Sequence, residues 1–454
     1  MSDANLPLQS IDDCVNYFYS GETPEQDWVI GTEHEKIALY EDTLERVPYE
    51  GERGIATLLE TIAKQGDWDP ILESNKIIGL KRNGASITLE PGGQFELSGA
   101  PLATIKETCA EFNSHVDQVK SISRDLGIVW LSLGVDPLHA VSDVPVMPKS
   151  RYQIMRDYLP TRGGLGLEMM HLSATVQANF DFSDEADIAA KLRTAMGCTP
   201  LVSALFANSP LSAGTENGFV TKRLAIWQDT DPDRCGLLPF VFESGFGYAR
   251  YAEWALDVPM FFLIREGRYI PARGLDFRTF MEKGLEGHRA QLSDWDMHLT
   301  TLFPEVRLKQ IIEVRGADAV PRELTCALPA IWKGILYDAE ALAEAWDLVS
   351  SFTFEERVEA QAERLVVVVR RLQRQDRRLE VRVVALAELV ARVQDERVLA
   401  PALDALERLQ LLRRRAAADR VGVGERRDQR AVEGVAVHLR RPVRLALGGR
   451  HRRR

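Results

Sequence analysis

The sequence predicts an α+β fold built on an antiparallel sheet. Segments with the two-residue period of strands and segments with the three- and four-residue period of helices follow one another without a regular strand–helix–strand alternation. No repeat of fixed length is evident, and a hydrophobic content of 45% is ordinary for a globular protein. Parallel sheets require that alternation, so we expect an antiparallel sheet flanked by helices.

Each expected element rests on its own pattern. Apolar residues at helical spacing predict helices at residues 54–65, 102–126, 186–208 and 324–350. Alternating or apolar runs predict strands within residues 25–40 and at 76–81, 86–98, 127–134 and 172–182, with a weaker one at 308–315. The triplet Pro91-Gly92-Gly93 is a turn signal that interrupts the strand at 86–98.

Composition excludes several classes of protein. The 454-residue chain has no apolar run near the roughly 18 residues that a membrane-spanning helix needs. Its first ten residues are polar and lack the features of a secretory signal. Five cysteines are too few for a disulfide scaffold at this length. We therefore expect a cytoplasmic protein with no membrane partner.

Residues 356–454 differ in composition from the rest of the chain. Residues 361–454 contain 24 arginines and no lysine, and residues 355–454 use only ten amino-acid types. All ten types can be encoded with G or C as the first codon base, which is typical of a GC-rich gene read out of frame. We therefore predict that this tail is out-of-frame sequence. The alternatives are a natural Arg/Ala/Leu-rich helical tail and, less favoured, a basic arm that binds nucleic acid.

Several predicted strands carry glutamates on a polar face. Alternate residues of a strand share a face, so Glu33 and Glu35 point the same way, as do Gln177 and Asn179. By the same rule three more glutamates occupy polar faces, namely Glu90, Glu96 and Glu313. Most such faces simply meet water, and that interpretation stays open for any one strand. Crowded carboxylates, however, repel one another unless cations neutralise them.

These residue types indicate metal-dependent nucleotide chemistry. Oxygen-only clusters suit hard cations such as Mg²⁺ or Mn²⁺, which leave coordination sites for phosphate oxygens. Arginines are suited to bidentate phosphate or carboxylate contacts, and the candidates are Arg151, Arg156, Arg223 and Arg234. Neither a Walker loop nor a GxGxxG motif is present.

Eight stretches in order resemble the plant and proteobacterial type of glutamate–cysteine ligase. They are IGTEHEK (30–36), ITLEPGGQFELSGAP (87–101), TCAEFNSH (108–115), MPKSRYQIMRDYLP (147–160), TVQANFDF (175–182), IWQDTDPDRCG (226–236), IIEVRGAD (311–318) and CALPAIWKGILYD (326–338). The resemblance implies a glutamine-synthetase-like fold whose curved sheet forms a funnel around the active site. It also implies a catalytic domain at residues 1–355, with the tail at 356–454 replacing the family's C-terminal helices.

The resemblance further implies an ATP-dependent ligase that joins the γ-carboxylate of L-glutamate to L-cysteine through a γ-glutamyl phosphate, the first step of glutathione synthesis. The implied metal ligands are Glu33, Glu35, Glu90, Glu96 and Glu313. The implied catalytic arginines are Arg151, Arg223 and Arg315, and the implied substrate or ATP contacts are Arg151, Arg223, Arg234, Gln177 and Asn179. In the family, the counterparts of Cys109 and Cys326 can form a regulatory disulfide.

The expected partners are therefore L-glutamate, L-cysteine and ATP, with Mg²⁺ or Mn²⁺ and without nucleic acid, in a monomer or homodimer. Two alternatives stay open at this point. One is a related ligase that joins glutamate to a different amine. The other is a non-catalytic or misfolded chain, because of the tail.

Overall fold

The computed structural model describes residues 6–362. Most of the tail therefore lies outside the described residues, and its out-of-frame origin stays a prediction. The first residues of the tail continue a helix that begins before it, α14 (Phe354–Ala362).

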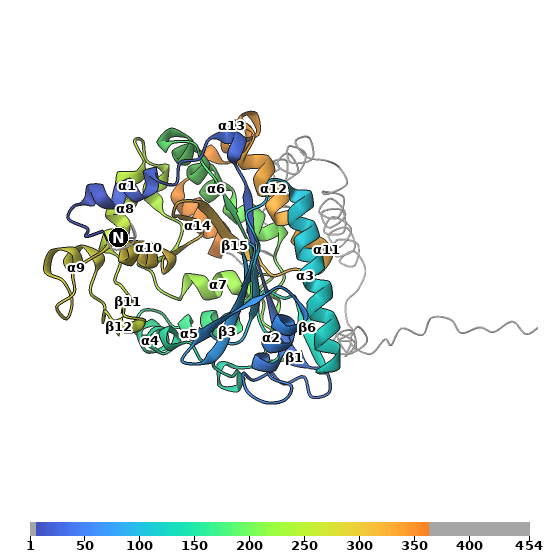
Figure 1. Cartoon of the computed structure of the whole chain (residues 1–454). Helices are drawn as coiled ribbons and strands as arrows, with labels where there is room; N and C mark the ends of the chain where they lie inside the picture. The colour runs from blue at the N-terminus through green and yellow to red at the C-terminus, as the bar shows by residue number, and fades with distance from the viewer. Residues whose placement is uncertain (1–5, 363–454) are drawn as a thin grey trace, which may run out of the picture. The chain divides into compact units, whose positions relative to one another are not determined.

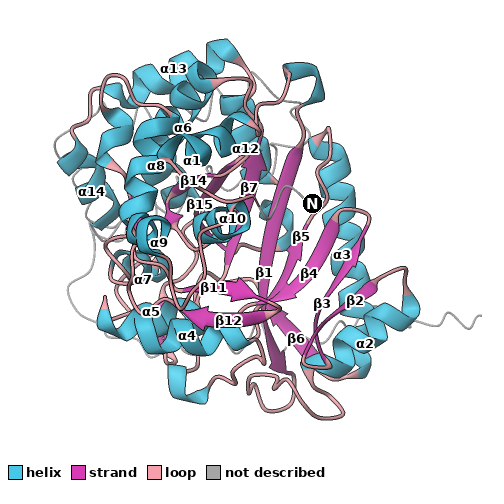
Figure 2. Ribbon diagram, turned by 60° about the vertical axis from the view of Figure 1, so that its left-hand side comes forward, coloured by secondary structure: helices cyan, strands magenta, loops and turns pink. Residues whose placement is uncertain are grey.

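A nine-stranded antiparallel sheet is the centre of the described part of the chain. Eight strands follow one another in the order β14 (Val306–Leu308), β15 (Ile312–Asp318), β7 (Thr175–Phe180), β1 (Ile30–Tyr40), β5 (Phe95–Ser98), β4 (Ala85–Leu89), β3 (Lys76–Arg82) and β2 (Asp69–Glu73). The ninth strand, β6 (Ile128–Leu131), pairs with the second half of β1. The sheet is open and visibly twisted in Figure 2. The predicted α+β class and its antiparallel sheet are confirmed.

Helices cover both faces of this sheet. They are α1 (Ile11–Tyr19), α2 (Ile55–Gln65), α3 (Ile105–Asp125), α4 (Ser150–Tyr158), α5 (Gly166–Leu172), α6 (Glu185–Leu205), α7 (Lys222–Gln228), α8 (Tyr248–Asp257), α9 (Phe277–Lys283), α10 (Leu292–Thr300), α11 (Arg322–Thr325), α12 (Ala327–Leu336) and α13 (Ala339–Ser350), besides α14. Figure 1 shows the sheet nearly edge-on, with α3 and α12 on one side and α4, α5 and α7 on the other.

Three short strand pairs lie apart from the main sheet. They are β8 (Leu211–Ser212) with β9 (Thr215–Glu216), β10 (Cys235–Gly236) with β13 (Phe303–Pro304), and β11 (Phe262–Arg265) with β12 (Arg268–Pro271). The β11–β12 hairpin lies near α4 and brings Phe262 toward the polar face of the sheet.

Local sequence explains where the helices begin. Thr104 caps α3 by accepting a hydrogen bond from the Glu107 amide, and the Glu107 carboxylate accepts one from the Thr104 amide in return. Asp338 caps α13 through the Ala341 amide. The prediction of one continuous helix at 324–350 is wrong, because the chain forms three helices there. The breaks fall at Cys326 and at Tyr337-Asp338, where the Asp338 cap starts a new helix.

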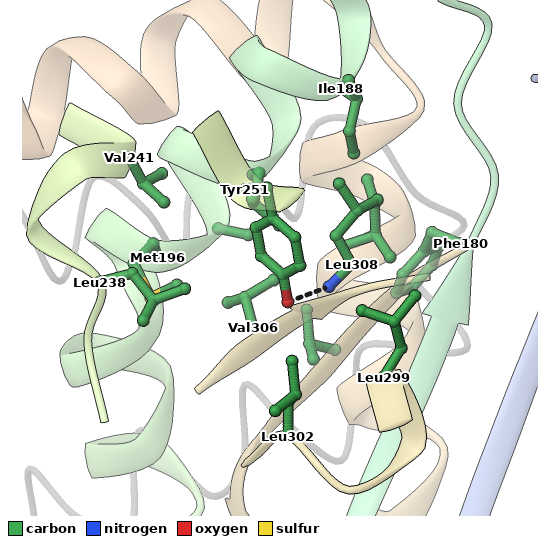
Figure 3. Close-up of a cluster of buried hydrophobic side chains, with 14 of the residues drawn as sticks. Phe180, Ile188, Met196, Leu238, Val241, Tyr251, Leu299, Leu302, Val306 and Leu308 are labelled. Carbon is green, nitrogen blue, oxygen red and sulfur yellow. Dashed lines mark hydrogen bonds between the residues drawn. The ribbon is translucent and has the colours of Figure 1, made fainter. Parts of the chain in front are cut away.

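Apolar side chains from distant segments of the chain pack against β7, β14 and β15. Figure 3 shows Tyr251 of α8 among buried aliphatic residues, with its hydroxyl accepting a hydrogen bond of 3.0 Å from the Leu308 amide. This bond ties α8 to β14 inside the core. No helix among residues 6–362 combines the length and apolar character that crossing a bilayer demands.

Candidate active site

A cavity of about 300 Å³ opens on the face of the sheet that carries the glutamates. Its floor is formed by β1, β4, β5, β7 and β15. Its walls come from α4, α5, α7 and α10, together with the β11–β12 hairpin. The lining residues that the sequence predicted for the site are Glu33, Glu35, Glu90, Glu96, Arg151, Gln177, Arg223 and Arg315.

Strand alternation and register bring the glutamates together. Glu33 and Glu35 point toward the cavity from β1, whereas His34 between them packs on Phe112 of α3, with 4.5 Å between the ring centroids. The register places Glu35 opposite Glu96 of β5 and Glu33 opposite Gln177 of β7. Residues far apart in sequence thus meet on one face.

Each of three glutamates is held by hydrogen bonds from its neighbours. Glu33 accepts from the Gln177 and Asn179 side-chain amides at 3.0 and 3.1 Å. Glu96 accepts from the hydroxyls of Thr88 and Ser98 at 3.1 and 2.8 Å. The carboxylate of Glu35 accepts a bond of 3.1 Å from the Thr175 amide. These contacts fix the direction of the carboxylates.

The electrostatics of this face disfavour bare carboxylates. Burial raises the pKa of Glu33 to about 7, with further contributions from the charges of Glu313 and Glu96. The pKa of Glu35 is raised well above its usual range by burial and by repulsion from Glu90 and Glu96. Burial and the charge of Glu90 also raise the pKa of Glu96. A bound cation would relieve this repulsion.

The donor set fits a hard divalent cation that is shared with a ligand. Within residues 6–362, no three His, Cys, Asp or Glu side chains converge on a ready-made metal cage. Mg²⁺ usually takes one or two carboxylates and completes its coordination with water and substrate phosphates. The four cavity glutamates, spread over β1, β5 and the turn after β4, match that mode.

Arginines face the glutamates across the cavity. Arg315 of β15 donates a hydrogen bond of 2.8 Å to the side-chain oxygen of Gln177. Arg223 of α7 donates one of 3.1 Å to the backbone oxygen of Arg315. Arg151 lies at the start of α4, against the ring of Tyr152. The cavity therefore presents carboxylates that can bind metal ions and guanidinium groups that can bind anionic oxygens.

Glu313, expected to be a metal ligand, is bound by cations of the protein itself. It is fully buried and forms ion pairs with Arg307 at 2.6 Å, with Lys309 at 3.3 Å and with Arg315. Despite its burial, these charges lower the pKa of Glu313. Its oxygens face guanidinium groups and it does not line the cavity. We therefore assign it to anchoring Arg307 and Arg315.

Arg307 is a cavity residue that the sequence analysis missed. It lies on β14 directly opposite Glu313 of β15. The weak alternation predicts a strand at 308–315, which leaves Arg307 just outside it. The signal that could have found it is the Val-Arg-Leu alternation at 306–308.

Three other expected contacts lie elsewhere. Arg234 is fully buried outside the cavity lining, and its guanidinium is satisfied by Asp231 at 2.6 Å and by backbone oxygens of Thr301 and Pro259. Asn179 supports Glu33 and does not line the cavity. Arg156 contacts the ring of His171.

An apolar wall completes the cavity and was also missed. It comes from helices whose packing against the sheet could not be predicted from local patterns. Its members are Tyr152, Met155, Met169, Met170, Trp227, Phe262, Met297 and Phe303. Such a wall suits an adenine ring or an apolar substrate part and limits the access of water.

Cys109 and Cys326 lie side by side, although on different helices. Cys109 belongs to α3, and Cys326 lies at the junction of α11 and α12. A hydrogen bond between the two thiols lowers the pKa of Cys109 and raises that of Cys326. Both cysteines are reduced in this structure.

Comparison with known proteins gives one consistent family. The family model of glutamate-cysteine ligase family 2 (GCS2) matches residues 29–437. Glutamate–cysteine ligase B, chloroplastic, from Oryza sativa subsp. japonica is 51% identical over 349 residues, which cover 76% of this chain and 70% of the relative. The chloroplastic glutamate–cysteine ligases of Solanum lycopersicum and Arabidopsis thaliana are 50% and 49% identical over 349 residues, covering 76% of this chain and 66% of each relative.

Two further findings follow from these comparisons. The expectation of a cytoplasmic location is contradicted, because these relatives are named chloroplastic. Among solved structures, a glutamate–cysteine ligase from Francisella tularensis in complex with AMP aligns with a TM-score of 0.40 and 11% identity, covering 90% of this chain and 98% of that one.

Proposed function

Because this chain belongs to the glutamate–cysteine ligase family, we propose that its acidic cavity joins the γ-carboxylate of L-glutamate to the amine of L-cysteine and forms γ-glutamylcysteine, with ATP as co-substrate. One observation carries the proposal. Glu33, Glu35, Glu90 and Glu96 line the same cavity as four arginines, on one face of the sheet.

The reaction needs an activated carboxylate. A carboxylate and an amine do not condense at useful rates in water, so the γ-carboxylate oxygen first attacks the γ-phosphorus of ATP and ADP leaves. The cysteine amine then attacks the carbonyl carbon of the γ-glutamyl phosphate. The C–O bond to phosphate breaks, and the amine proton leaves with the phosphate. No covalent bond to a side chain of the enzyme is required.

The cavity glutamates would hold the divalent cations. Mg²⁺, when bound there, supplies positive charge that stabilises the phosphoryl group during transfer, and Mn²⁺ can take the same oxygen ligands. Glu33, Glu35, Glu90 and Glu96 provide carboxylates from the sheet and from the turn that follows β4. Hydrogen bonds from Gln177 and Ser98 keep Glu33 and Glu96 aimed into the cavity.

The arginines would bind the negative oxygens of the substrates. Arg151, Arg223 and Arg315 line the cavity from three different elements and can neutralise carboxylate or phosphate oxygens. Gln177 joins both sets, because it donates to Glu33 and accepts from Arg315. It thereby couples the position of a metal-binding carboxylate to that of an anion-binding guanidinium.

The apolar wall protects the acyl phosphate. Water attacks such an anhydride readily, and the reaction is productive only if the amine arrives first. Met155, Met170, Phe262 and Met297 cover the polar floor and reduce the space for water.

The adjacent thiols of Cys109 and Cys326 support a second, regulatory proposal. A disulfide between them would link α3 to the α11–α12 junction. Helices α3 and α12 both pack against β1. The interaction between the two thiols places them near each other, as formation of a disulfide requires.

The direct test is release of phosphate from ATP by the full-length chain. The proposal expects release only when glutamate and cysteine are both present, with a mass corresponding to γ-glutamylcysteine in the product. Replacing cysteine by other amines tests the alternative amine substrate. Glu33→Ala should abolish turnover while leaving thermal unfolding nearly unchanged. Phosphate release that ignores the amine would contradict the proposal.

A further inference from the structure

Arg223 is a buried cation with few direct partners. Its side chain is 3% exposed, and within residues 6–362 its guanidinium donates one hydrogen bond, to the backbone oxygen of Arg315. Among the described residues, no carboxylate lies within 4.0 Å of its guanidinium, and its Nε atom is buried without a partner. The neighbouring Arg315 carries the same charge and lies near the same indole ring, that of Trp227. Something other than the guanidinium contacts must fix this side chain.

The helix that carries Arg223 is too short to fix it unaided. Helix α7 has seven residues, and Arg223 is its second. A helix of that length is marginal by itself, so contacts from outside the helix must hold its first turn in place. Ser209 and Thr221 do this with their hydroxyls. Ser209 accepts a bond of 3.2 Å from the Arg223 amide, and Thr221 accepts one of 3.3 Å from the Leu224 amide.

Asp318 holds both hydroxyls. One carboxylate oxygen accepts from the Ser209 hydroxyl at 2.7 Å and from the Asn208 amide at 2.7 Å. The other oxygen accepts from the Thr221 hydroxyl at 2.9 Å. Both oxygens of one carboxylate are therefore connected, through two hydroxyls, to two backbone amides in the first turn of α7.

The carboxylate is itself rigidly placed. Asp318 is 1% exposed at the end of β15, the strand that also carries Arg315. A methyl group on Gly134 would come within 2.3 Å of its carboxyl carbon, so the chain leaves no room for it to shift in that direction. Asp318 does not line the cavity. Its effect on substrates can only be indirect.

We propose that Asp318 is a positioning residue, which locks the first turn of α7 to β15 and thereby sets the distance between the guanidiniums of Arg223 and Arg315. The inference rests on the proposed role of Arg223 in binding substrate oxygens. It adds that the spacing of the two arginines, and hence the fit to a carboxylate or phosphate group, is defined by a carboxylate behind the site.

The experiment is a double-mutant cycle on the full-length chain with Asp318→Asn, Arg223→Lys and the double variant. Asparagine keeps the size of the side chain but cannot accept bonds at both positions. We measure kcat and KM for glutamate and for ATP, together with thermal unfolding. Asp318→Asn should lower kcat/KM by about tenfold for the substrate that responds to Arg223→Lys. In the Arg223→Lys background the same change should have little further effect.

Three outcomes are decisive. If Arg223→Lys lowers kcat/KM and the effects of the two substitutions simply multiply, the positioning role is overturned while the proposed function stands. If Arg223→Lys leaves every kinetic parameter unchanged, the proposed role of Arg223 fails, and the positioning role fails with it. If the effects of the two substitutions on kcat/KM are non-additive, and if they appear for one substrate only, the inference is supported.

Two further variants guard against misfolding and a general loss of capping. Ser209→Ala removes one of the two bridging hydroxyls and should reproduce a milder form of the Asp318→Asn effect, on the same substrate, if the latter variant does not fold. Asp276→Asn is the matched control, because Asp276 caps α9 through the Thr279 amide and hydroxyl, away from the cavity lining. Asp276→Asn should change thermal stability but should leave the KM for glutamate and the KM for ATP unchanged. An unchanged KM in Ser209→Ala, with Arg223→Lys impaired, would overturn the proposal.

Discussion

Glu35 and Glu96 lie directly opposite each other on the neighbouring strands β1 and β5, and both line the same cavity. Like charges in a cross-strand pair are destabilising, and burial strengthens the effect. The sheet therefore maintains a pair that lowers the stability of the free protein. Such a pair is expected where a ligand of opposite charge supplies the missing stabilisation.

Removing one charge of this pair should stabilise the protein while weakening its binding of cations. Glu35→Gln keeps an oxygen for the Thr175 amide but relieves the repulsion from Glu90 and Glu96. In the absence of metal we expect the free energy of unfolding to rise by about 1 kcal/mol, measured by urea denaturation. Turnover should fall sharply.

Glu111→Gln is the matched control for this prediction. Glu111 is also partly buried and accepts bonds from the Ala100 amide, but it does not line the cavity. It should give neither the gain in stability nor the loss of turnover. A destabilised Glu35→Gln variant would contradict the account of repulsion.

Glu313 should behave in the opposite way. It is enclosed by Arg307, Lys309 and Arg315, so Glu313→Gln leaves three cations with an uncharged partner. We expect the free energy of unfolding to fall by about 3 kcal/mol, with loss of turnover. In contrast, Asp257→Asn breaks an exposed pair with Arg278 and should cost less than about 1 kcal/mol. Equal effects in the two variants would show that burial of the Glu313 network contributes nothing.

Acid should destabilise the protein through His115. Burial, together with the charges of Lys36 and Arg82, lowers the pKa of His115 to about 3 from its ordinary value of 6.5. Between these values the unfolded chain binds a proton that the folded chain does not. The contribution of His115 to stability is therefore fully present above pH 6.5 and is lost as the pH falls toward 3.

His115→Phe should flatten this pH dependence, because phenylalanine can keep the packing against Phe95 and does not titrate. Between pH 7.5 and pH 5, the free energy of unfolding of the wild type should fall by about 2 kcal/mol more than that of His115→Phe. Urea denaturation of both proteins at pH 5, 7.5 and 8.5 measures it, and the interval above pH 7 is the internal control. Parallel stability curves at all three pH values would show that His115 is not neutral in the folded state.

The proposed disulfide predicts a change in the thiol count. Titration of the denatured chain should find all five cysteines after reduction and two fewer after mild oxidation. Cys109→Ser should abolish that difference, whereas Cys235→Ser should leave it. An unchanged number of free thiols after oxidation of the wild-type chain would contradict the proposed disulfide.

Local patterns predicted the parts of the site that lie along single strands. The alternation in β1 correctly placed Glu33 and Glu35 on one face, and His34 between them packs on the opposite side. It could not reveal that Glu35 faces Glu96, because strand pairing depends on contacts between distant segments. The apolar wall was missed for the same reason, since it forms only when α4, α5 and α10 pack over the sheet.

Two charged residues show where residue type alone misleads. Arg234 has the chemistry of a phosphate ligand, but its guanidinium forms a buried ion pair with Asp231 in the same turn. Glu313 has the chemistry of a metal ligand, but Arg307 from the neighbouring strand occupies its oxygens. In both cases the deciding partner is a buried counter-ion, which lies in the same turn for Arg234 and on the neighbouring strand for Glu313.

The proposed function requires that the glutamates on this sheet face bind divalent cations together with the nucleotide. Titration of Mn²⁺ into the full-length chain, followed by electron paramagnetic resonance with and without ATP, tests it most directly. We predict binding that tightens when ATP is present and that is lost in a variant carrying both Glu35→Gln and Glu96→Gln. Mn²⁺ binding in that variant equal to the wild type, in the presence of ATP, would contradict the account.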